Sequence, residues 1–147
     1  MEIKTQIIIN ATPDKVWAVL MDFENYPNWN SFIKNVSGDP KVGGQITVSI
    51  VSPNGEQMTF KPIVLAFEHH KELRWLGRLW FKGVFDGEHT FELMDSGRGT
   101  TIFNHSETFK GVLAGLFKKQ LKNSTRSGFE RMNRDLKKRV ESKSCGL

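Results

Sequence analysis

Residues 113–140, LAGLFKKQLKNSTRSGFERMNRDLKKRV, carry the pattern that decides the fold. The large apolar residues recur at steps of three, four and eight, which is the spacing of one face of an amphipathic helix. They are Leu113, Leu116, Phe117, Leu121, Phe129, Met132, Leu136 and Val140. The middle of that face carries Ser124, Thr125 and Gly128 instead of bulky side chains. Because cores are close-packed and glycine costs a helix about 1 kcal/mol, these small residues indicate a close backbone contact or space for something other than protein. We favour the second interpretation, a sheet that grips the helix around an internal pocket.

The composition is that of an ordinary soluble protein with a skew toward aromatic rings. The chain has 147 residues, 38% hydrophobic and 25% charged, which predicts one domain, 1–147, with a tail that is disordered after about residue 141. Eleven Phe and four Trp against one Tyr supply rings that pack a core or line an apolar cavity. No run approaches the roughly 18 apolar residues of a membrane span, no signal peptide is expected, and the single Cys145 can form no internal disulfide. These features predict a cytoplasmic location.

The positive charge is concentrated in the C-terminal segment. Residues 110–147 hold eleven Lys and Arg against three acids, whereas the preceding 109 residues hold ten against thirteen. A basic helix can dock on anionic lipid or nucleic acid, or it can present a solvated outer face opposite its apolar stripe. We favour the solvated face, and predict no nucleic-acid partner, no membrane insertion, and weak binding to polyanions that fades with salt. This face should contain Lys118, Lys119, Lys122, Arg126, Arg134 and Lys137.

The rest of the chain predicts a strand, two short helices and an antiparallel meander. A strand at 2–10 precedes a helix that Thr12 can cap and Pro13 can begin, and a second short helix or turn spans 23–29. Further strands, separated by hairpin turns, are expected near 44–52, 56–68, 71–80, 84–94 and 99–109. Because only the last helix is long enough to cover the sheet, the predicted fold is α+β.

Residues 9–17, INATPDKVW, and 22–29, DFENYPNW, form a motif. A small residue and Pro precede a helix, a Val-Trp pair lies in it, and a Tyr-Pro-x-Trp turn follows. This pattern resembles the opening of the START/Bet v 1-like superfamily, also called SRPBCC, which includes proteins labelled polyketide cyclase/dehydrase. The resemblance implies a helix-grip fold, in which a curved antiparallel sheet wraps around the long C-terminal helix with a deep cavity between them. Members bind lipids, sterols, polyketides or plant hormones, and a few are cyclases, so the fold alone does not choose the function.

Three polar residues stand out in the last two predicted strands. Alternation places His89, His105 and Glu107 on the faces that also carry phenylalanines, which indicates that they point inward. A desolvated carboxylate beside histidines could act as acid and base in a cyclisation or dehydration. The alternative is that the three residues bond one another or only orient a ligand. Glu88 falls on the opposite face and should meet solvent, unless a bulge at Gly87 turns it inward.

The sequence gives less support to a metal site, a nucleophilic serine, a phosphate-binding loop or a nucleic-acid surface. Two His and a Glu can hold zinc, but their spacing matches no metal motif, so we expect no metal and no other cofactor. No Rieske cysteine–histidine pattern is present, no Ser sits in a nucleophile elbow, and Gly43-Gly44 opens a strand rather than a helix. The Arg and Trp residues of 74–80, RWLGRLW, could stack on nucleic acid. A strand with Leu73, Trp75 and Leu79 inward and Arg74 and Arg78 outward explains them more simply.

We therefore predict a binder of a hydrophobic or aromatic small molecule, such as a lipid or polyketide, in an internal cavity. The first alternative is an enzyme of the polyketide cyclase/dehydrase type that uses His89, His105 and Glu107, and the second is an interaction protein that acts through its basic helix. The oligomeric state is left open between monomer and homodimer.

Gly128→Leu is expected to leave folding intact and to block ligand uptake. The predicted ligand-binding residues are Trp29 and Phe32 near the mouth, then Trp75, Phe85, His89, Phe91, Phe103, His105, Glu107, Leu121, Thr125 and Phe129.

Overall fold

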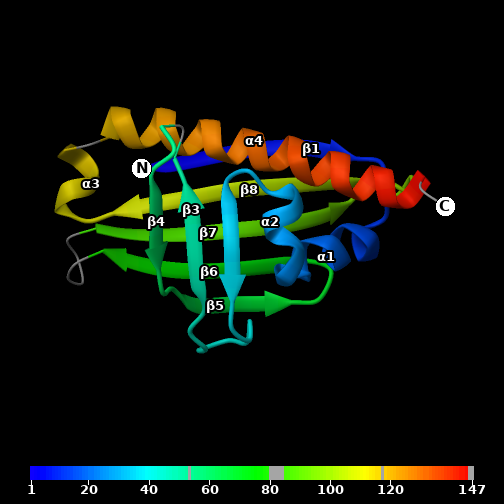
Figure 1. Ribbon diagram of the computed structural model, residues 1–147, viewed down its shortest axis with the longest axis horizontal. Helices are drawn as coiled ribbons and strands as arrows, with labels where there is room; N and C mark the ends of the chain where they lie inside the picture. The colour runs from blue at the N-terminus through cyan, green and yellow to red at the C-terminus, as the bar shows by residue number, and fades with distance from the viewer. Residues whose placement is uncertain (53, 80–84, 117, 146–147) are drawn as a thin grey trace.

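Antiparallel sheets packed around one long helix form the architecture (Figure 1). A computed structural model describes the chain except residues 53, 80–84, 117 and 146–147, and it does not describe the side chains of Leu79, Phe85, Leu121, Ser144 and Cys145. Its elements in chain order are β1 (Glu2–Ile9), α1 (Pro13–Met21), η1 (Phe23–Asn25), α2 (Tyr26–Trp29), β2 (Ile33–Ser37), β3 (Thr47–Val51), β4 (Gln57–Phe60), β5 (Ile63–Glu68), β6 (Glu72–Leu79), β7 (Phe85–Asp95), β8 (Thr101–Lys110), α3 (Val112–Leu116) and α4 (Lys118–Cys145).

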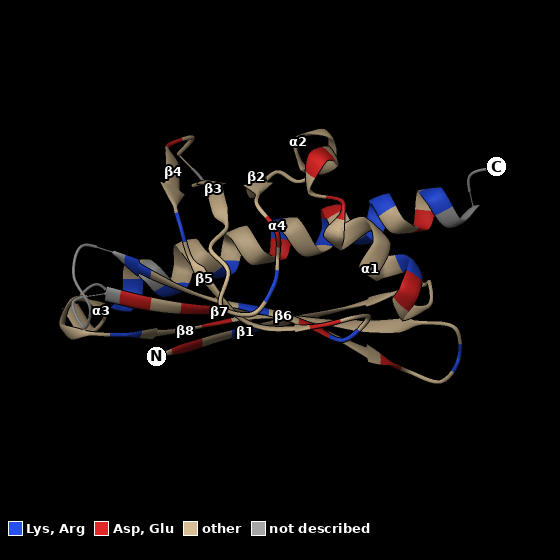
Figure 2. Ribbon diagram, turned by 90° about the horizontal axis from the view of Figure 1, so that it is seen from below, with Lys and Arg blue, Asp and Glu red and all other residues tan. Residues whose placement is uncertain are grey.

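The strands build a floor and a wall around α4. Within the described residues, the floor is a five-stranded sheet in the order β1-β8-β7-β6-β5, and β2, β3 and β4 form a three-stranded sheet. A single bridge between Gln45 and Ile63 links the chain before β3 to β5. Figure 2 shows β2, β3 and β4 rising from the floor beside α4. The predicted α+β helix-grip architecture is confirmed.

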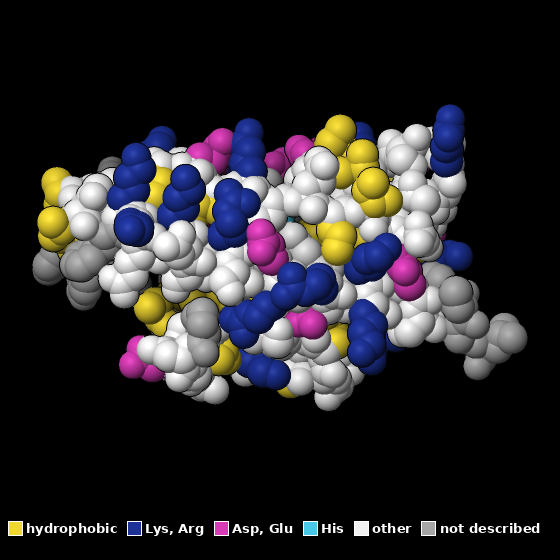
Figure 3. All heavy atoms as spheres, turned by 90° about the horizontal axis from the view of Figure 1, so that it is seen from above, with side chains coloured by type: hydrophobic (Ala, Val, Ile, Leu, Met, Phe, Trp, Pro, Cys, Tyr) yellow, Lys and Arg dark blue, Asp and Glu magenta, His cyan; other side chains and the backbone are white. Residues whose placement is uncertain are grey.

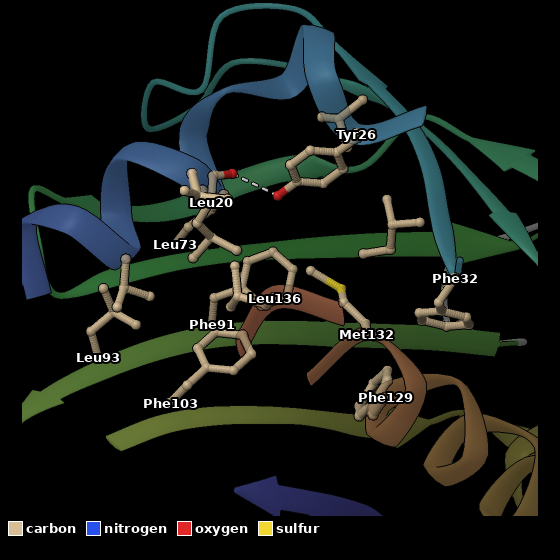
Figure 4. Close-up of a cluster of buried hydrophobic side chains, with 14 of the residues drawn as sticks. Leu20, Tyr26, Phe32, Leu73, Phe91, Leu93, Phe103, Phe129, Met132 and Leu136 are labelled. Carbon is tan, nitrogen blue, oxygen red and sulfur yellow. Dashed lines mark hydrogen bonds between the residues drawn. The ribbon is translucent and has the colours of Figure 1, made fainter. Parts of the chain in front are cut away.

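The apolar stripe of α4 packs on the inner face of the floor. Phe129, Met132, Leu136 and Val140 are all buried, as the helical spacing predicts. They meet side chains such as Phe91 from the floor strands (Figure 4). The same core is closed at one end by α1 and α2, where the Tyr26 hydroxyl donates a hydrogen bond of 2.6 Å to the Leu20 carbonyl.

The basic side of α4 also covers the free edge of β1. Arg126 Nη1 donates to the Lys4 carbonyl at 3.2 Å, and Lys137 Nζ donates to the Ile8 carbonyl at 2.9 Å. The Asn10 amide donates to Glu141 Oε2 at 3.0 Å. An edge strand exposes unpaired carbonyls that invite aggregation, and these cations satisfy two of them. Arg126 and Lys137, predicted to be plain solvated charges, are therefore half-buried.

Several boundaries differ from those predicted. β2 was not predicted, and the strand expected at 56–68 is divided into β4 and β5 around Pro62, which has no N–H to donate to a sheet. The helix expected from Leu113 onward corresponds to α3 and α4, which lie on either side of the undescribed residue 117, and α4 ends at Cys145. Thr12 does begin α1, but its hydroxyl bonds the Asp14 carboxylate rather than a backbone N–H.

Candidate functional site

The cross-strand register brings the three polar candidates together. Trp75 of β6 lies opposite His89 of β7, and His89 lies opposite Glu107 of β8. The neighbouring row places Phe91 opposite His105, and His105 opposite Thr5 of β1. Side chains two residues apart in a strand share a face, so both rows point to the same side of the sheet. His89 and His105 are buried there, as alternation predicts.

A continuous row of hydrogen bonds starts at the edge strand and runs across the sheet. The Thr5 hydroxyl donates to the His105 carbonyl at 2.8 Å and accepts from Asn133 Nδ2 at 2.9 Å. Asn133 Oδ1 lies 2.9 Å from His105 Nδ1, and His105 Nε2 lies 2.9 Å from His89 Nε2. His89 Nδ1 then faces Glu107 Oε1 at 3.8 Å. We call these five side chains the polar row.

The bond partners fix which atom carries each proton. Since Asn133 Nδ2 donates to Thr5, its Oδ1 must accept, and His105 carries its proton on Nδ1. In neutral His105 the Nε2 atom is then an acceptor, so His89 donates from Nε2. Neutral His89 consequently presents a lone pair at Nδ1 toward Glu107. A protonated Glu107 completes this donor and acceptor pattern, because its O–H can point toward the lone pair of His89 Nδ1.

Burial favours this neutral state at every titratable position. Desolvation raises the pKa of Glu107 from its ordinary 4.5 to about 8 and lowers the pKa of His89 from 6.5 to about 3. Desolvation also lowers the pKa of His105 well below 6.5, and the neighbouring His89 adds to that effect. At neutral pH the row therefore holds a carboxylic acid beside two neutral imidazoles.

Two aromatic rings clamp the imidazoles in place. The Trp75 indole stacks on His89 with centroids 4.5 Å apart and planes 8° from parallel. The Phe129 ring of α4 stacks on His105 with centroids 3.8 Å apart and planes 13° from parallel. These contacts hold both imidazole planes, and they explain why the predicted Trp75 and Phe129 lie at the centre of the site.

Glu107 is the outer end of the polar row. Its side chain is 16% exposed, against 5% for His89, and no hydrogen bond to its carboxyl group is found among the described residues. Gly87 lets that carboxyl lie directly over β7, since a Cβ there would be 3.0 Å from Glu107 Oε1. The β7–β8 register is regular at Gly87, so no bulge redirects Glu88, which lies on the other face and pairs with Arg74 at 3.1 Å.

The glycine notch of α4 is filled by a ring, which corrects the prediction that it forms empty space. A Cβ added at Gly128 would lie 2.4 Å from Phe32 Cε1. Phe32 is buried and packs edge-on against Phe129 at a centroid distance of 5.7 Å (Figure 4). The small residue serves close packing of an aromatic ring, and Gly128→Leu is no longer expected to be tolerated.

The turn before β2 holds Phe32 in the notch. Asn30 Oδ1 accepts hydrogen bonds from the amides of Phe32 and Ile33 at 3.0 and 2.8 Å. The Ser31 amide and hydroxyl both donate to Asp135 Oδ2 of α4, at 2.9 and 2.6 Å. The position of Phe32, shortly after α2, is therefore tied to α4.

The family model described as "Polyketide cyclase / dehydrase and lipid transport" matches residues 1–141. The chain belongs to this family. No curated protein matches it in sequence. Among solved structures, a START superfamily protein from Mycobacterium smegmatis is 19% identical with a TM-score of 0.71, over 96% of this chain and 97% of that one. A protein from Nitrosomonas europaea is 16% identical with a TM-score of 0.76, over 99% and 97%.

A third neighbour is the di-domain ARO/CYC StfQ from the steffimycin biosynthetic pathway. It is 10% identical with a TM-score of 0.76, over 97% of this chain and 52% of StfQ. At these identities the neighbours establish the shared fold. The family match over residues 1–141 confirms the predicted resemblance to polyketide cyclase/dehydrase proteins.

The remaining predicted site residues differ in how deeply they are buried. Phe91 and Phe103 are buried beside His105, with centroids 4.9 and 5.6 Å from its ring. Trp29 is half-buried and its Nε1 atom is buried without a hydrogen-bond partner among the described residues. Thr125 is half-buried on α4. The side chains of Phe85 and Leu121 lie outside the described residues.

Sequence reasoning missed Asn133 and Thr5. Asn133 is 3% exposed and lies beside Phe129 and Met132 on the buried face of α4. An amide in the middle of an apolar stripe was the available signal, because a buried amide needs partners. Thr5 lies on the inward side of the first strand among isoleucines, where a hydroxyl is equally conspicuous.

Further features of the described residues concern metal binding, membrane spans and surface hollows. No group of three or more His, Cys, Asp or Glu is arranged to hold a metal ion within the described part of the chain, and no described helix is long and apolar enough to cross a membrane. A surface hollow of about 500 Å³ lies between α1 and the end of α4, lined by Lys15, Ala18, Val19, Asp22, Val140 and Lys143. None of the predicted ligand residues lines this hollow.

Proposed function

We propose that this protein binds an apolar small molecule beside the outer end of the polar row and recognises its polar group with Glu107 and His89. The observation that carries the proposal is the polar row itself. Burying three titratable groups in a core costs free energy that an apolar core avoids, and such groups cluster at functional sites. The family description, which names cyclases, dehydrases and lipid transport, supports the same class of ligand.

The protonation pattern defines the polar group that fits. Neutral Glu107 offers an O–H donor, and His89 Nδ1 offers an acceptor 3.8 Å away. A ligand carbonyl can accept from Glu107, and a nearby ligand hydroxyl can donate to His89. A carboxylate ligand finds no cation among the described members of the row to offset the cost of burying its charge. We therefore propose a neutral, carbonyl-bearing ligand.

A second candidate is catalysis of dehydration, favoured by the placement of an acid next to a base. His89 Nδ1 can take the proton from the carbon between a ketone and a β-hydroxyl-bearing carbon, and Glu107 can protonate the departing hydroxyl, which leaves as water. A C=C bond forms, the C–O bond breaks, and return of the proton from His89 to Glu107 restores the site. Such transfers require hydrogen-bond distances, so the 3.8 Å separation must shorten in the complex.

The test of binding is native mass spectrometry of protein purified gently from its own host, followed by identification of any co-purified small molecule. The proposal predicts a neutral, largely apolar mass that is present in the wild type and lost in Glu107→Leu. Conversion of an added β-hydroxyketone would establish the second candidate, whereas saturable binding without turnover would leave binding alone. A co-purified ligand that is fully retained by Glu107→Leu contradicts the assigned recognition.

A further inference from the structure

The most exposed large apolar side chains of the described residues lie together on α3. Val112 is 77% exposed and Leu116 is 72% exposed. Four residues apart on a helix, they share one face. Leu116 was predicted to belong to the buried stripe of the long helix, but it lies on α3 and is exposed. Figure 1 shows α3 at the end of the molecule opposite the C-terminus.

Lysines with no described ion pair flank this apolar face in the sequence. Between Glu107 and Glu130 the chain contains no carboxylate. Exposed lysines flank α3 on both sides, and no described ion pair engages them; they are Lys110, Lys118, Lys119 and Lys122. Figure 3 shows hydrophobic side chains at this end of the molecule next to a row of Lys and Arg along α4.

We propose that α3 and the first turns of α4 form a docking surface for an anionic lipid bilayer. Aliphatic side chains gain free energy by entering the lipid interface, and lysines around them gain from the negative surface potential. We call this surface the α3 tip; it consists of Val112, Leu116 and the four lysines above. A bilayer is the partner that uses both parts of the tip at once.

Other partners fit this surface less well. Nucleic acid would attract the lysines, but its phosphate backbone offers no apolar environment in which Val112 and Leu116 could be buried. A symmetric contact with a second copy would set one lysine cluster against the other, which is unfavourable. The expectation of weak polyanion binding assumed that the apolar face of the helix was already used by the sheet. The sheet does cover the apolar face of α4, but the apolar face of α3 is exposed.

Vesicle co-sedimentation tests this proposal, which is independent of the ligand proposed above. Wild type should bind vesicles containing about one third phosphatidylglycerol at least tenfold more strongly than pure phosphatidylcholine vesicles. Val112→Ser with Leu116→Ser should weaken binding about tenfold, and Lys118→Gln with Lys119→Gln should do likewise. Matched controls are Val42→Ser, at a side chain 64% exposed elsewhere, and Lys138→Gln with Lys143→Gln at the other end of α4. Both should bind as wild type does.

Two outcomes would overturn the docking surface. Equal sedimentation of wild type with anionic and neutral vesicles would show that the tip does not recognise charge. Loss of binding in the lysine variant but not in the Val112/Leu116 variant, together with equally tight binding to duplex DNA, would make the tip a general polyanion site. Circular dichroism of each variant establishes that the fold is retained.

Discussion

The Phe32 ring occupies the space that Gly128 leaves open on α4, where an added Cβ would lie 2.4 Å from Phe32 Cε1. Gly128→Ala should therefore lower the free energy of unfolding, by about 1–3 kcal/mol, because the ring or the helix must move in a packed core. Urea denaturation followed by fluorescence measures the change. The higher helix propensity of alanine should raise the free energy of unfolding by about 1 kcal/mol. A net decrease would therefore show that the steric clash with Phe32 outweighs this gain.

Gly115 of α3 is the matched control for Gly128, since a Cβ there would meet nothing within 4 Å. Gly115→Ala should leave stability unchanged or raise it by up to about 1 kcal/mol. Adding Phe32→Leu to Gly128→Ala should recover part of the loss, because the smaller side chain vacates the notch. Equal stability of Gly128→Ala and wild type would contradict the packing of Phe32 against Gly128.

Local patterns predicted the architecture well because periodicity reports burial directly. The stripe from Phe129 to Val140 and the alternation in β7 and β8 both lie on the faces that the sequence indicated. β2 was missed because its pairing with β3 is a tertiary property with only a short apolar signal of its own. Leu116 was predicted to be buried because the apolar spacing continues from α3 into α4.

For the site, the sequence predicted which side chains of each strand point inward, but it did not predict the contacts between strands. Alternation identified His89, His105 and Glu107, but the order in which they bond depends on the register of three strands and on Asn133 from α4. The notch at Gly128 was read as empty because nothing in the α4 sequence shows that Phe32, distant in the chain, fills it. Such contacts are non-local and leave no periodic signal.

Glu107 should make stability decline with rising pH. Its pKa is raised in the folded state, to about 8 from 4.5, so between these values the unfolded chain loses a proton that the folded chain keeps. The free energy of unfolding should then fall by up to about 1.4 kcal/mol per pH unit. Below pH 6.5 the histidines act in the opposite direction, since unfolded His89 binds a proton that the folded residue, with its pKa lowered to about 3, does not.

Denaturation at pH 6.5, 7.25 and 8 (chosen within about one unit of the relevant pKa values) isolates the carboxyl group. Glu107→Gln is neutral at every pH and should lose the decline over this window, while Glu88→Gln, on the outer face beside Arg74, should retain it. A decline of the same size in Glu107→Gln as in wild type would show that Glu107 is already ionised in the folded protein at pH 6.5.

Asn133→Asp should favour the charged form of His105, which burial now keeps neutral. The new carboxylate would accept from His105 Nδ1 and attract a proton to the ring, so the pKa of His105 should rise from its lowered value. The donor to Thr5 is lost, which costs about 1–3 kcal/mol of stability. NMR titration of the imidazole nitrogens measures the pKa, and Asn123→Asp, on an exposed part of α4, should leave it unchanged. A His105 that stays neutral down to the acid limit of folding in Asn133→Asp would contradict the assigned proton positions.

The most direct test of ligand recognition by neutral Glu107 is the pH dependence of binding of an apolar naphthalene ketone such as Prodan, whose emission responds to hydrogen bonding at its carbonyl. Fluorescence titrations should show saturable binding to wild type that weakens as pH rises through about 8, where Glu107 loses its proton. Binding to Glu107→Gln, which keeps a donor, should not change over the same range, and binding to Glu107→Leu should be weak throughout. Wild-type affinity that is constant from pH 6.5 to above the pKa of about 8, or equal to that of Glu107→Leu, would contradict the account.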